Sequence, residues 1–312
     1  MNHGDDDNSD DYVDEDYDVK GNDDDDDNDE FFRLDDGDDM YYVPSQDVRR
    51  SQTNAYNNEV ECNNQYLPWN KGVNTTGSVW PYGITFFHKP TGRISDGRLV
   101  PDFIAINATL RLPVPYLEEG GEFVDGVNFA SAGSGVLGFN KKAINLEEQL
   151  EYFKTFAKQL QQKLGHEEAE SLLHRSVFLF STGGNDYVIY NMRRDPSLSE
   201  QVEHVGQVLG NLTAALEEFY ALGARKIGFQ NVGPLGCMPD VRERTNEIEV
   251  DCVERFMRHA TLHNSFLSTV LEQFAHKHPD FKYALFDYYN ALRNRTLHPT
   301  EYGNQLFIFK QN

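Results

Sequence analysis

The sequence lacks long apolar runs, has only three cysteines and contains no cluster of basic residues. A membrane-spanning helix needs roughly 20 consecutive apolar residues, so the sequence predicts none. Three cysteines are too few for a small protein that is stabilised mainly by disulfides. Without a C-x-x-C pair there is no indication of a zinc site. Because 51 Asp and Glu outnumber 28 Lys and Arg, binding of nucleic acid through a basic surface is not expected. The sequence therefore predicts no metal ion and no cofactor.

Acidic residues are abundant, and most of the excess lies at the N-terminus. Residues 1–40 hold 20 Asp and Glu but only Lys20 and Arg33, which accounts for −18 of the net charge of −23. A segment this charged and this poor in apolar side chains is predicted to be disordered. We interpret it as a solvated tail whose protein partner, if it has one, is unknown. Residues 41–60 are expected to form an irregular linker before a globular domain at 61–312.

The sequence leaves localisation open. The first forty residues have neither the basic start nor the apolar stretch of a secretory signal peptide. Acceptor patterns for N-glycosylation, on the other hand, are typical of secreted proteins and favour such an origin weakly. They occur four times in the body of the chain, at Asn74, Asn107, Asn211 and Asn294.

Helical periodicity appears from Asn145 onward. Apolar residues at helical spacing predict helices over 145–165, 202–223 and 253–274. The first of these begins at Asn145, which forms a predicted capping box with Glu148.

Short apolar runs between the helices predict strands over 177–180, 226–229 and 281–288, the first of them buried on both faces. Strands separated by long helices favour a parallel sheet between helical layers. Ligands of such folds bind beyond the carboxyl ends of the strands. The turns after Phe180 and Phe229 are therefore expected to carry the chemistry.

Four strings occur in a fixed order: WPYGITFFHKPTGRISDGRLVPDFIA (80–105), GVNFASAGSGV (126–136), STGGNDY (181–187) and LGARKIGFQNVGPLGCMP (222–239). Together they closely resemble the plant GDSL esterase/lipase family, a branch of the SGNH hydrolases, over about residues 62–303. The resemblance implies an α/β fold with a flavodoxin-like parallel sheet in a three-layer α/β/α arrangement, incomplete in this chain. It also implies hydrolysis of carboxylic esters, with an acyl-ester or lipid-like small molecule as the ligand.

The resemblance also assigns an oxyanion hole. Acyl transfer needs donors that await the negative charge appearing on the carbonyl oxygen. Gly133 matches the family's glycine donor, whose backbone N–H can approach the substrate closely, and Asn185 matches its asparagine amide. Gly183 shapes the second turn, and Asp186 is expected to brace the loop rather than to react.

The nucleophile of the family is not found. Residues 62–67 match the end of its first motif, and counting back places the GDSL serine at Asn57, whose amide cannot be activated by a histidine. No apolar run precedes it, so a central strand is expected to be missing. Three replacements are disfavoured: Ser51 has no strand to aim it, Ser95 fits a structural loop, and Cys62 lies five residues past the expected position.

The general base is also in doubt. Family members continue to an Asp-x-x-His pair, whereas this chain ends at Asn312, so the domain is expected to be truncated at its C-terminus. His298 has Arg295 rather than Asp three positions before it, and we interpret it as a loop residue. Cys237 and Cys252 match positions that pair as a disulfide in secreted relatives, although two buried free thiols remain an alternative.

Three accounts stay open. The chain is an active ester hydrolase, a non-catalytic protein that binds an acyl group or a partner, or a fragmentary gene product. The resemblance implies an esterase/lipase. The residues at the nucleophile and base positions favour an esterase/lipase that is impaired or inactive.

Overall fold

The computed structural model describes residues 60–63 and 299 as backbone and, in full, residues 80, 82–118, 120–121, 123, 125–247, 252–298 and 300–302. They all belong to one compact unit, Pro44–Asn312. The predicted acidic tail and almost all of the predicted linker lie outside the described residues, as do Asn57, Ser51 and Asn74.

Six parallel strands form one sheet in the order β2-β3-β1-β4-β5-β6. Without the two-residue strand β2, this order is the flavodoxin-like one, with its reversal between β1 and β4. The predicted α/β fold class is therefore confirmed. The strands are β1 (Val60–Asn63), β2 (Val114–Pro115), β3 (Val127–Asn128), β4 (Val177–Ser181), β5 (Lys226–Gln230) and β6 (Lys282–Phe286).

Strand β1 corrects the expectation that a central strand is missing. It lies between β3 and β4, where Val60 is in register with both Val127 and Phe178. Its sequence, VECN, has no continuous apolar run. A strand flanked on both sides is held by backbone hydrogen bonds, which do not depend on side-chain type, so position in the sheet overrides local propensity.

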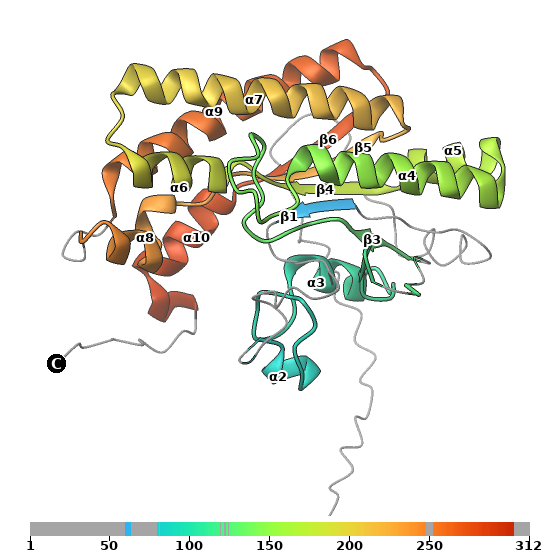
Figure 1. The fold of residues 1–312 in the computed structure, drawn as a ribbon, viewed down its shortest axis with the longest axis horizontal. Coiled ribbons are helices and arrows are strands. Elements are labelled where there is room, and N and C mark those ends of the chain that lie inside the picture. Colours follow the sequence, from blue (N-terminus) through green and yellow to red (C-terminus); the bar gives the residue numbers. More distant parts are fainter. Residues whose placement is uncertain are drawn as a thin grey trace, which may run out of the picture. The chain divides into compact units, whose positions relative to one another are not determined.

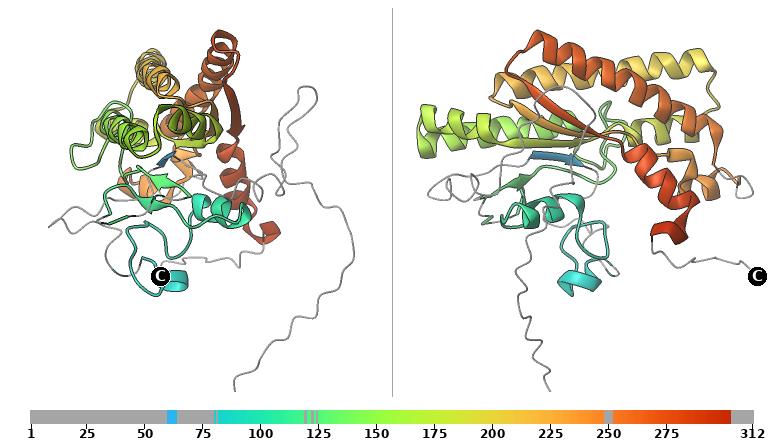
Figure 2. Two further views of the ribbon diagram at one scale, coloured as in Figure 1. Left: turned by 90° about the vertical axis from the view of Figure 1, so that its right-hand side faces the viewer. Right: turned by 180° about the vertical axis from the view of Figure 1, so that it is seen from behind.

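Helices α4, α5, α7 and α9 lie on one side of the sheet, and α3 and α10 lie on the other (Figures 1 and 2). The three predicted helices are confirmed as α4, α7 and α9. None of the described helices is both long and apolar enough to cross a membrane. The helices are α2 (Ile84–Phe87), α3 (Val100–Asn107), α4 (Leu146–Leu164), α5 (His166–Arg175), α6 (Gly184–Arg193), α7 (Leu198–Ala221), α8 (Pro239–Arg244), α9 (Glu254–Lys277) and α10 (Tyr288–Leu297), with 3-10 turns η2 (Leu235–Cys237) and η3 (Pro299–Tyr302).

An aromatic core fills the space between the sheet and the helical layer that contains α4 and α7. The Phe219 ring of α7 lies 5.1 Å, between centroids, from both Phe153 of α4 and Phe180 of β4. Phe180 in turn stacks on Phe229 of β5 at 5.8 Å. These rings are almost completely buried, so each contributes about 2–3 kcal/mol of hydrophobic stabilisation.

The opposite face of β4 is less covered. Val177 is 40% exposed and Leu179 only partly buried. The prediction that this strand is buried on both faces is therefore wrong, because the described helices lie mainly on the other side.

Candidate active site

Two turns at the carboxyl edge of the sheet carry the predicted oxyanion residues. Gly133 lies in the loop between β3 and α4, and Asn185 lies in the first turn of α6, directly after β4. Since β3, β1 and β4 are parallel neighbours, both turns leave the sheet at the same edge. The strands that precede the two turns, β3 and β4, flank β1, and the strand order reverses between β1 and β4.

A direct hydrogen bond joins the two turns. The Asn185 side-chain amide donates to the Ser134 carbonyl oxygen at 2.8 Å. An amide has two N–H groups, so one is left for a ligand oxygen. The Gly133 N–H forms no hydrogen bond with another described residue. The fold thus brings together the two groups that the sequence singled out, and their action on a substrate oxygen stays a prediction.

Gly133 occupies a position that only glycine fits easily. Its φ of 78° is left-handed, and a Cβ there would lie 2.6 Å from the Asn140 amide nitrogen. That amide donates to the Gly133 carbonyl oxygen at 3.1 Å. A larger residue would therefore disturb the hydrogen bond that shapes the loop.

Asp186 holds the Gly133 loop against α6. Its two carboxylate oxygens accept hydrogen bonds from the Val136 and Leu137 N–H groups, both at 2.8 Å. A Cβ on Gly135 would lie 2.8 Å from the same carboxylate. Burial raises the pKa of Asp186, while the N–H donors act in the opposite direction. These two contacts tie the loop to α6, which is what the sequence predicts for a bracing residue.

The start of α4 fixes the same loop from the other side. Asn145 accepts a hydrogen bond from the Gly135 N–H at 3.2 Å, and Gln149 donates to the Ser134 hydroxyl at 3.0 Å. Glu148 accepts from the Asn145 N–H at 3.1 Å, as the predicted capping box requires. The sequence pattern predicted Asn145 only as a helix cap and gave no role to Gln149. The sequence feature that could have identified both residues is a polar side chain on the apolar side of a helix that follows a glycine-rich loop.

A buried histidine, His263, lies beneath the turn that carries Gly183 and Asn185. Gly183 has a φ of 102°, and a Cβ there would lie 3.1 Å from Cε1 of His263. His263 is fully buried, and its Nδ1 lies 2.6 Å from the Tyr187 hydroxyl. Burial lowers the pKa of His263 to about 3 and raises that of Tyr187 well above its usual value, so both groups are neutral. No pattern in the sequence links His263 to Tyr187, because the two are 76 residues apart.

His204, His259 and His263 form a buried group, termed here the histidine cluster, between α6, α7 and α9. The rings of His204 and His259 lie 5.5 Å apart, and His259 Nδ1 lies 2.8 Å from the Asn191 amide. Burial lowers the pKa of both His204 and His259 to about 4. Among the described residues, no three His, Cys, Asp or Glu side chains are arranged to hold a metal ion. We interpret the cluster as structural.

His298 and Ser95 make other contacts than a catalytic pair would. His298 follows α10, its side chain is 57% exposed, and its Nδ1 lies 3.8 Å from a carboxylate oxygen of Glu301. No hydrogen bond joins it to either oxyanion turn within the part of the chain described. The Ser95 hydroxyl accepts a hydrogen bond from the Gly97 N–H at 3.1 Å, which is a loop contact. Only the backbone of Cys62 is described.

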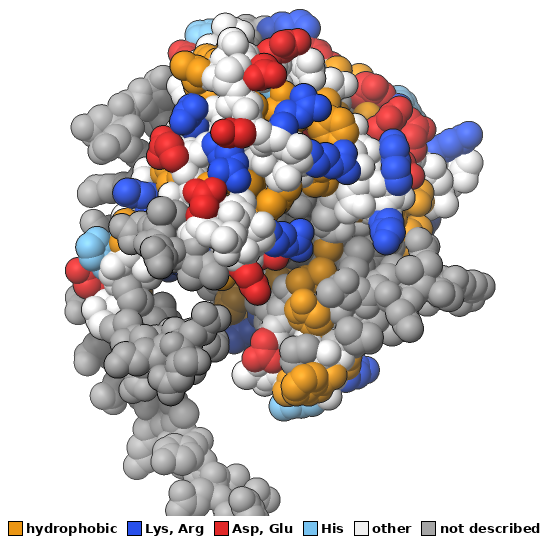
Figure 3. Space-filling view, turned by 60° about the vertical axis from the view of Figure 1, so that its left-hand side comes forward, with side chains coloured by type: hydrophobic (Ala, Val, Ile, Leu, Met, Phe, Trp, Pro, Cys, Tyr) orange, Lys and Arg blue, Asp and Glu red, His pale blue; other side chains and the backbone are white. Residues whose placement is uncertain are grey.

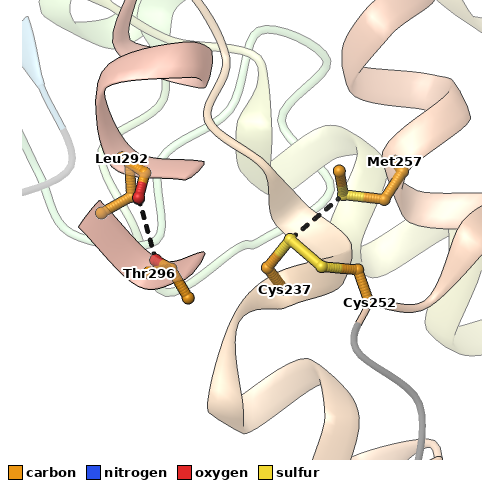
Figure 4. The surroundings of a disulfide bond; sticks show 5 residues. All are labelled: Cys237, Cys252, Met257, Leu292 and Thr296. Carbon is orange, nitrogen blue, oxygen red and sulfur yellow. Dashed lines mark hydrogen bonds between the residues drawn. A yellow bond between two sulfur atoms is a disulfide. The ribbon is translucent and has the colours of Figure 1, made fainter. Parts of the chain in front are cut away.

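Cys237 and Cys252 are joined by a disulfide, as the family resemblance implied (Figure 4). The bond ties η2 to the residue that precedes the start of α9. Met257 Sδ lies 3.6 Å from Cys237 Sγ. Because a disulfide sulfur carries no hydrogen, we interpret this approach as packing of polarizable atoms.

The predicted glycosylation sites that the structure describes are accessible. Asn107, Asn211 and Asn294 are exposed, on α3, α7 and α10 respectively. Their glycosylation stays a prediction. Acidic and basic side chains are interspersed on the face shown in Figure 3.

Comparison with known proteins gives a consistent result. The family described as GDSL-like Lipase/Acylhydrolase matches residues 51–308. GDSL esterase/lipase 5 of Arabidopsis thaliana is 40% identical over 242 residues, which cover 75% of this chain and 63% of that protein. The GDSL lipase of Tanacetum cinerariifolium is 40% identical over 247 residues, 77% of this chain and 64% of the relative. The inactive GDSL esterase/lipase-like protein 25 of Arabidopsis thaliana is 30% identical over 241 residues, 77% of this chain and 55% of the relative. The chain thus spans less than two thirds of the length of these relatives.

Proposed function

Because the chain belongs to the GDSL-like lipase and acylhydrolase family, we propose that these 312 residues form an esterase/lipase-like protein with impaired or absent ester hydrolysis. One contrast supports the proposal. The Gly133 and Asn185 turns are joined and braced, whereas no described histidine is paired with a carboxylate beside them. The sequence also contains no GDS string.

Oxyanion donors alone do not suffice for ester hydrolysis. Ester hydrolysis needs an attacking oxygen and a group that takes its proton, in addition to donors for the oxyanion. His263 lies beneath Gly183 in the Asn185 turn, but burial holds its pKa near 3 and Tyr187 occupies its Nδ1. An oxyanion hole without its nucleophile and base retains roughly 10³–10⁴-fold acceleration over water. We therefore expect a low residual rate with an acyl-ester substrate.

Two assays test this proposal. The purified 312-residue chain is incubated with short-chain p-nitrophenyl esters and, separately, with a fluorophosphonate probe that labels activated serines. We expect no labelling and only residual hydrolysis. Asn185→Ala is expected to reduce any residual rate by about 10²–10³, since it removes one oxyanion donor. Stoichiometric labelling, together with rapid turnover, would contradict the proposal.

A non-catalytic binding role is the second candidate. The observation that favours it is the number of contacts holding both turns in place, which leaves a pre-formed cradle for a carbonyl or carboxylate oxygen. A binding protein is expected to unfold in one cooperative transition that moves to higher temperature with a short-chain carboxylate. A broad, non-cooperative transition would instead favour the fragmentary gene product.

A further inference from the structure

We propose that a second site, separate from the oxyanion turns, binds a neutral polyhydroxylated ligand such as a monosaccharide or disaccharide. The site is a cavity of about 390 Å³ at the carboxyl ends of β5 and β6. Seven of its eight lining residues are polar: Asn231, Thr261, Asn264, Ser268, Asp287, Tyr289 and Asn290, with Leu285 as the eighth. The proposal does not depend on whether the chain hydrolyses esters.

The cavity lies at the same end of the sheet as the oxyanion turns, but away from the point between β1 and β4 where the strand order reverses. Asn231 directly follows β5, Asp287 directly follows β6, and α9 forms the opposite wall. The volume of the cavity falls within the range of about 300–1,000 Å³ that is usual for small-molecule pockets. None of the lining residues belongs to the Gly133 loop or the Asn185 turn.

Hydrogen bonds within the walls make the cavity a pre-formed one. The Asn231 amide donates to Asp287 at 3.1 Å, and its oxygen accepts from the Tyr289 N–H at 2.9 Å. Asn264 accepts from the Val232 N–H at 2.9 Å and donates to the Val232 carbonyl oxygen at 2.8 Å. Both turns that follow the strands are therefore fixed before any ligand enters.

The lining retains both acceptors and donors for a ligand. The hydroxyls of Thr261 and Ser268 donate to helix carbonyl oxygens at 3.0 and 3.2 Å, which leaves their lone pairs as acceptors. Asn290 uses its amide N–H toward Asp287 and keeps its oxygen. The Tyr289 hydroxyl forms no hydrogen bond with another described residue and can donate. Hydroxyl groups, which both donate and accept, match this mixture.

Charge argues against an ionic ligand. Asp287 is the only charged residue among those that line the cavity, and it repels anions. Partial burial raises the pKa of Asp287, but hydrogen bonds from Asn290 and Asn231 outweigh it and hold the pKa below its usual range. These three bonds already occupy much of the carboxylate, so one such group offers little to a cation. Leu285 and the Tyr289 ring provide apolar surface for a sugar ring face.

The test is ligand-observed NMR with glucose, xylose and cellobiose as probes of the full chain. We expect binding with a Kd on the order of 1 mM, which suits a small polar ligand. The double variant Thr261→Val, Ser268→Ala is expected to weaken binding about tenfold, since it removes two hydroxyls without changing buried packing. Thr155→Val on α4 is the matched control, because its exposed hydroxyl also donates to a helix carbonyl, that of Glu151, at 3.0 Å.

Three results would overturn the proposal: no sugar signal at about ten times the expected Kd, unchanged affinity in the double variant, or displacement of the sugar by acetate or methylamine. Circular dichroism of each variant shows whether it is folded. Asn185→Ala is expected to leave sugar binding unchanged, so loss of ester chemistry and loss of this site are told apart.

Discussion

The turns of the candidate active site depend on single residues that satisfy buried backbone groups or allow unusual backbone angles. Asp186 is 1% exposed and accepts hydrogen bonds from two N–H groups of a loop fifty residues earlier in the chain. Gly183 turns the chain from β4 into α6 with a left-handed backbone. Each residue leads to a measurable expectation.

Asp186→Ala is expected to lower the free energy of unfolding by about 2–4 kcal/mol, because the Val136 and Leu137 N–H groups lose their acceptor inside the protein. Chemical denaturation of the purified protein measures the change. Asp195→Ala is the control: Asp195 is exposed, and its removal is expected to change stability by less than about 0.5 kcal/mol. Equal stabilities of the two variants would show that the brace contributes nothing.

Gly183→Ala is expected to destabilise the protein by about 1–3 kcal/mol, since alanine is strained at a φ of 102° and its Cβ would meet His263 at 3.1 Å. Gly206→Ala, in the middle of α7, is expected to do the opposite. A Cβ there meets nothing within 4 Å, and alanine favours a helix by about 0.5–1 kcal/mol over glycine. Thermal melts of both variants test this difference in sign; a shift in the same direction for both would refute it.

At the scale of elements, the long helices and the strands of β4 to β6 follow from sequence periodicity, with small differences at their ends. The strand expected over 281–288 is shorter, Lys282–Phe286, because Asp287 caps α10 by accepting a hydrogen bond from the Asn290 N–H. Helices α2, α3, α5, α6, α8 and α10 were not predicted. They are ten residues or fewer, and such short helices are fixed by packing rather than by their own periodicity.

The disulfide between η2 and the start of α9 is expected to stabilise the protein by roughly 3 kcal/mol, because it closes a loop with a sequence separation of 15 residues. Reduction is therefore expected to lower the melting temperature of the wild-type chain. The double variant Cys237→Ser, Cys252→Ser is expected to melt at that lower temperature with or without the reductant. A reductant effect of the same size on the double variant would place the relevant thiol elsewhere.

On the scale of the whole molecule, the histidine cluster connects α6, α7 and α9 and makes stability depend on pH. The folded chain holds the pKa values of His204 and His259 at about 4 and that of His263 at about 3, while an unfolded histidine titrates near 6.5. As pH falls below about 6.5, the unfolded chain binds protons that the folded chain excludes. Stability is therefore full above about pH 6.5 and is lost toward pH 4, by up to about 1.4 kcal/mol per pH unit for each histidine.

His204→Phe is expected to remove one of these three contributions. His204 is 2% exposed, stacks on Tyr190 with centroids 3.9 Å apart, and neither of its ring nitrogens has a hydrogen-bond partner among the described residues, so phenylalanine fits the same space. The free energy of unfolding, measured between about pH 7 and pH 4.5, is expected to fall less steeply in the variant. His276→Phe, at an exposed position, is the control and is expected to keep the wild-type slope. Identical slopes for all three proteins would contradict a buried, neutral His204.

The sequence alone determined the family, the α/β class and the main helices and strands, and it singled out Gly133, Asn185 and Asp186 as candidate site residues, because periodicity and ordered motifs are local properties. Only the tertiary structure decided that VECN lies as a central strand, that His263 supports the turn of Gly183, and that amides and hydroxyls from β5, β6 and α9 line a second cavity. Each of these features brings together residues that are far apart in the sequence, by up to 118 positions. They meet in a strand pairing, in a hydrogen bond or in the wall of the cavity. Such contacts are stabilised by packing and hydrogen bonding between segments that are distant in the sequence. No local pattern in the sequence specifies them.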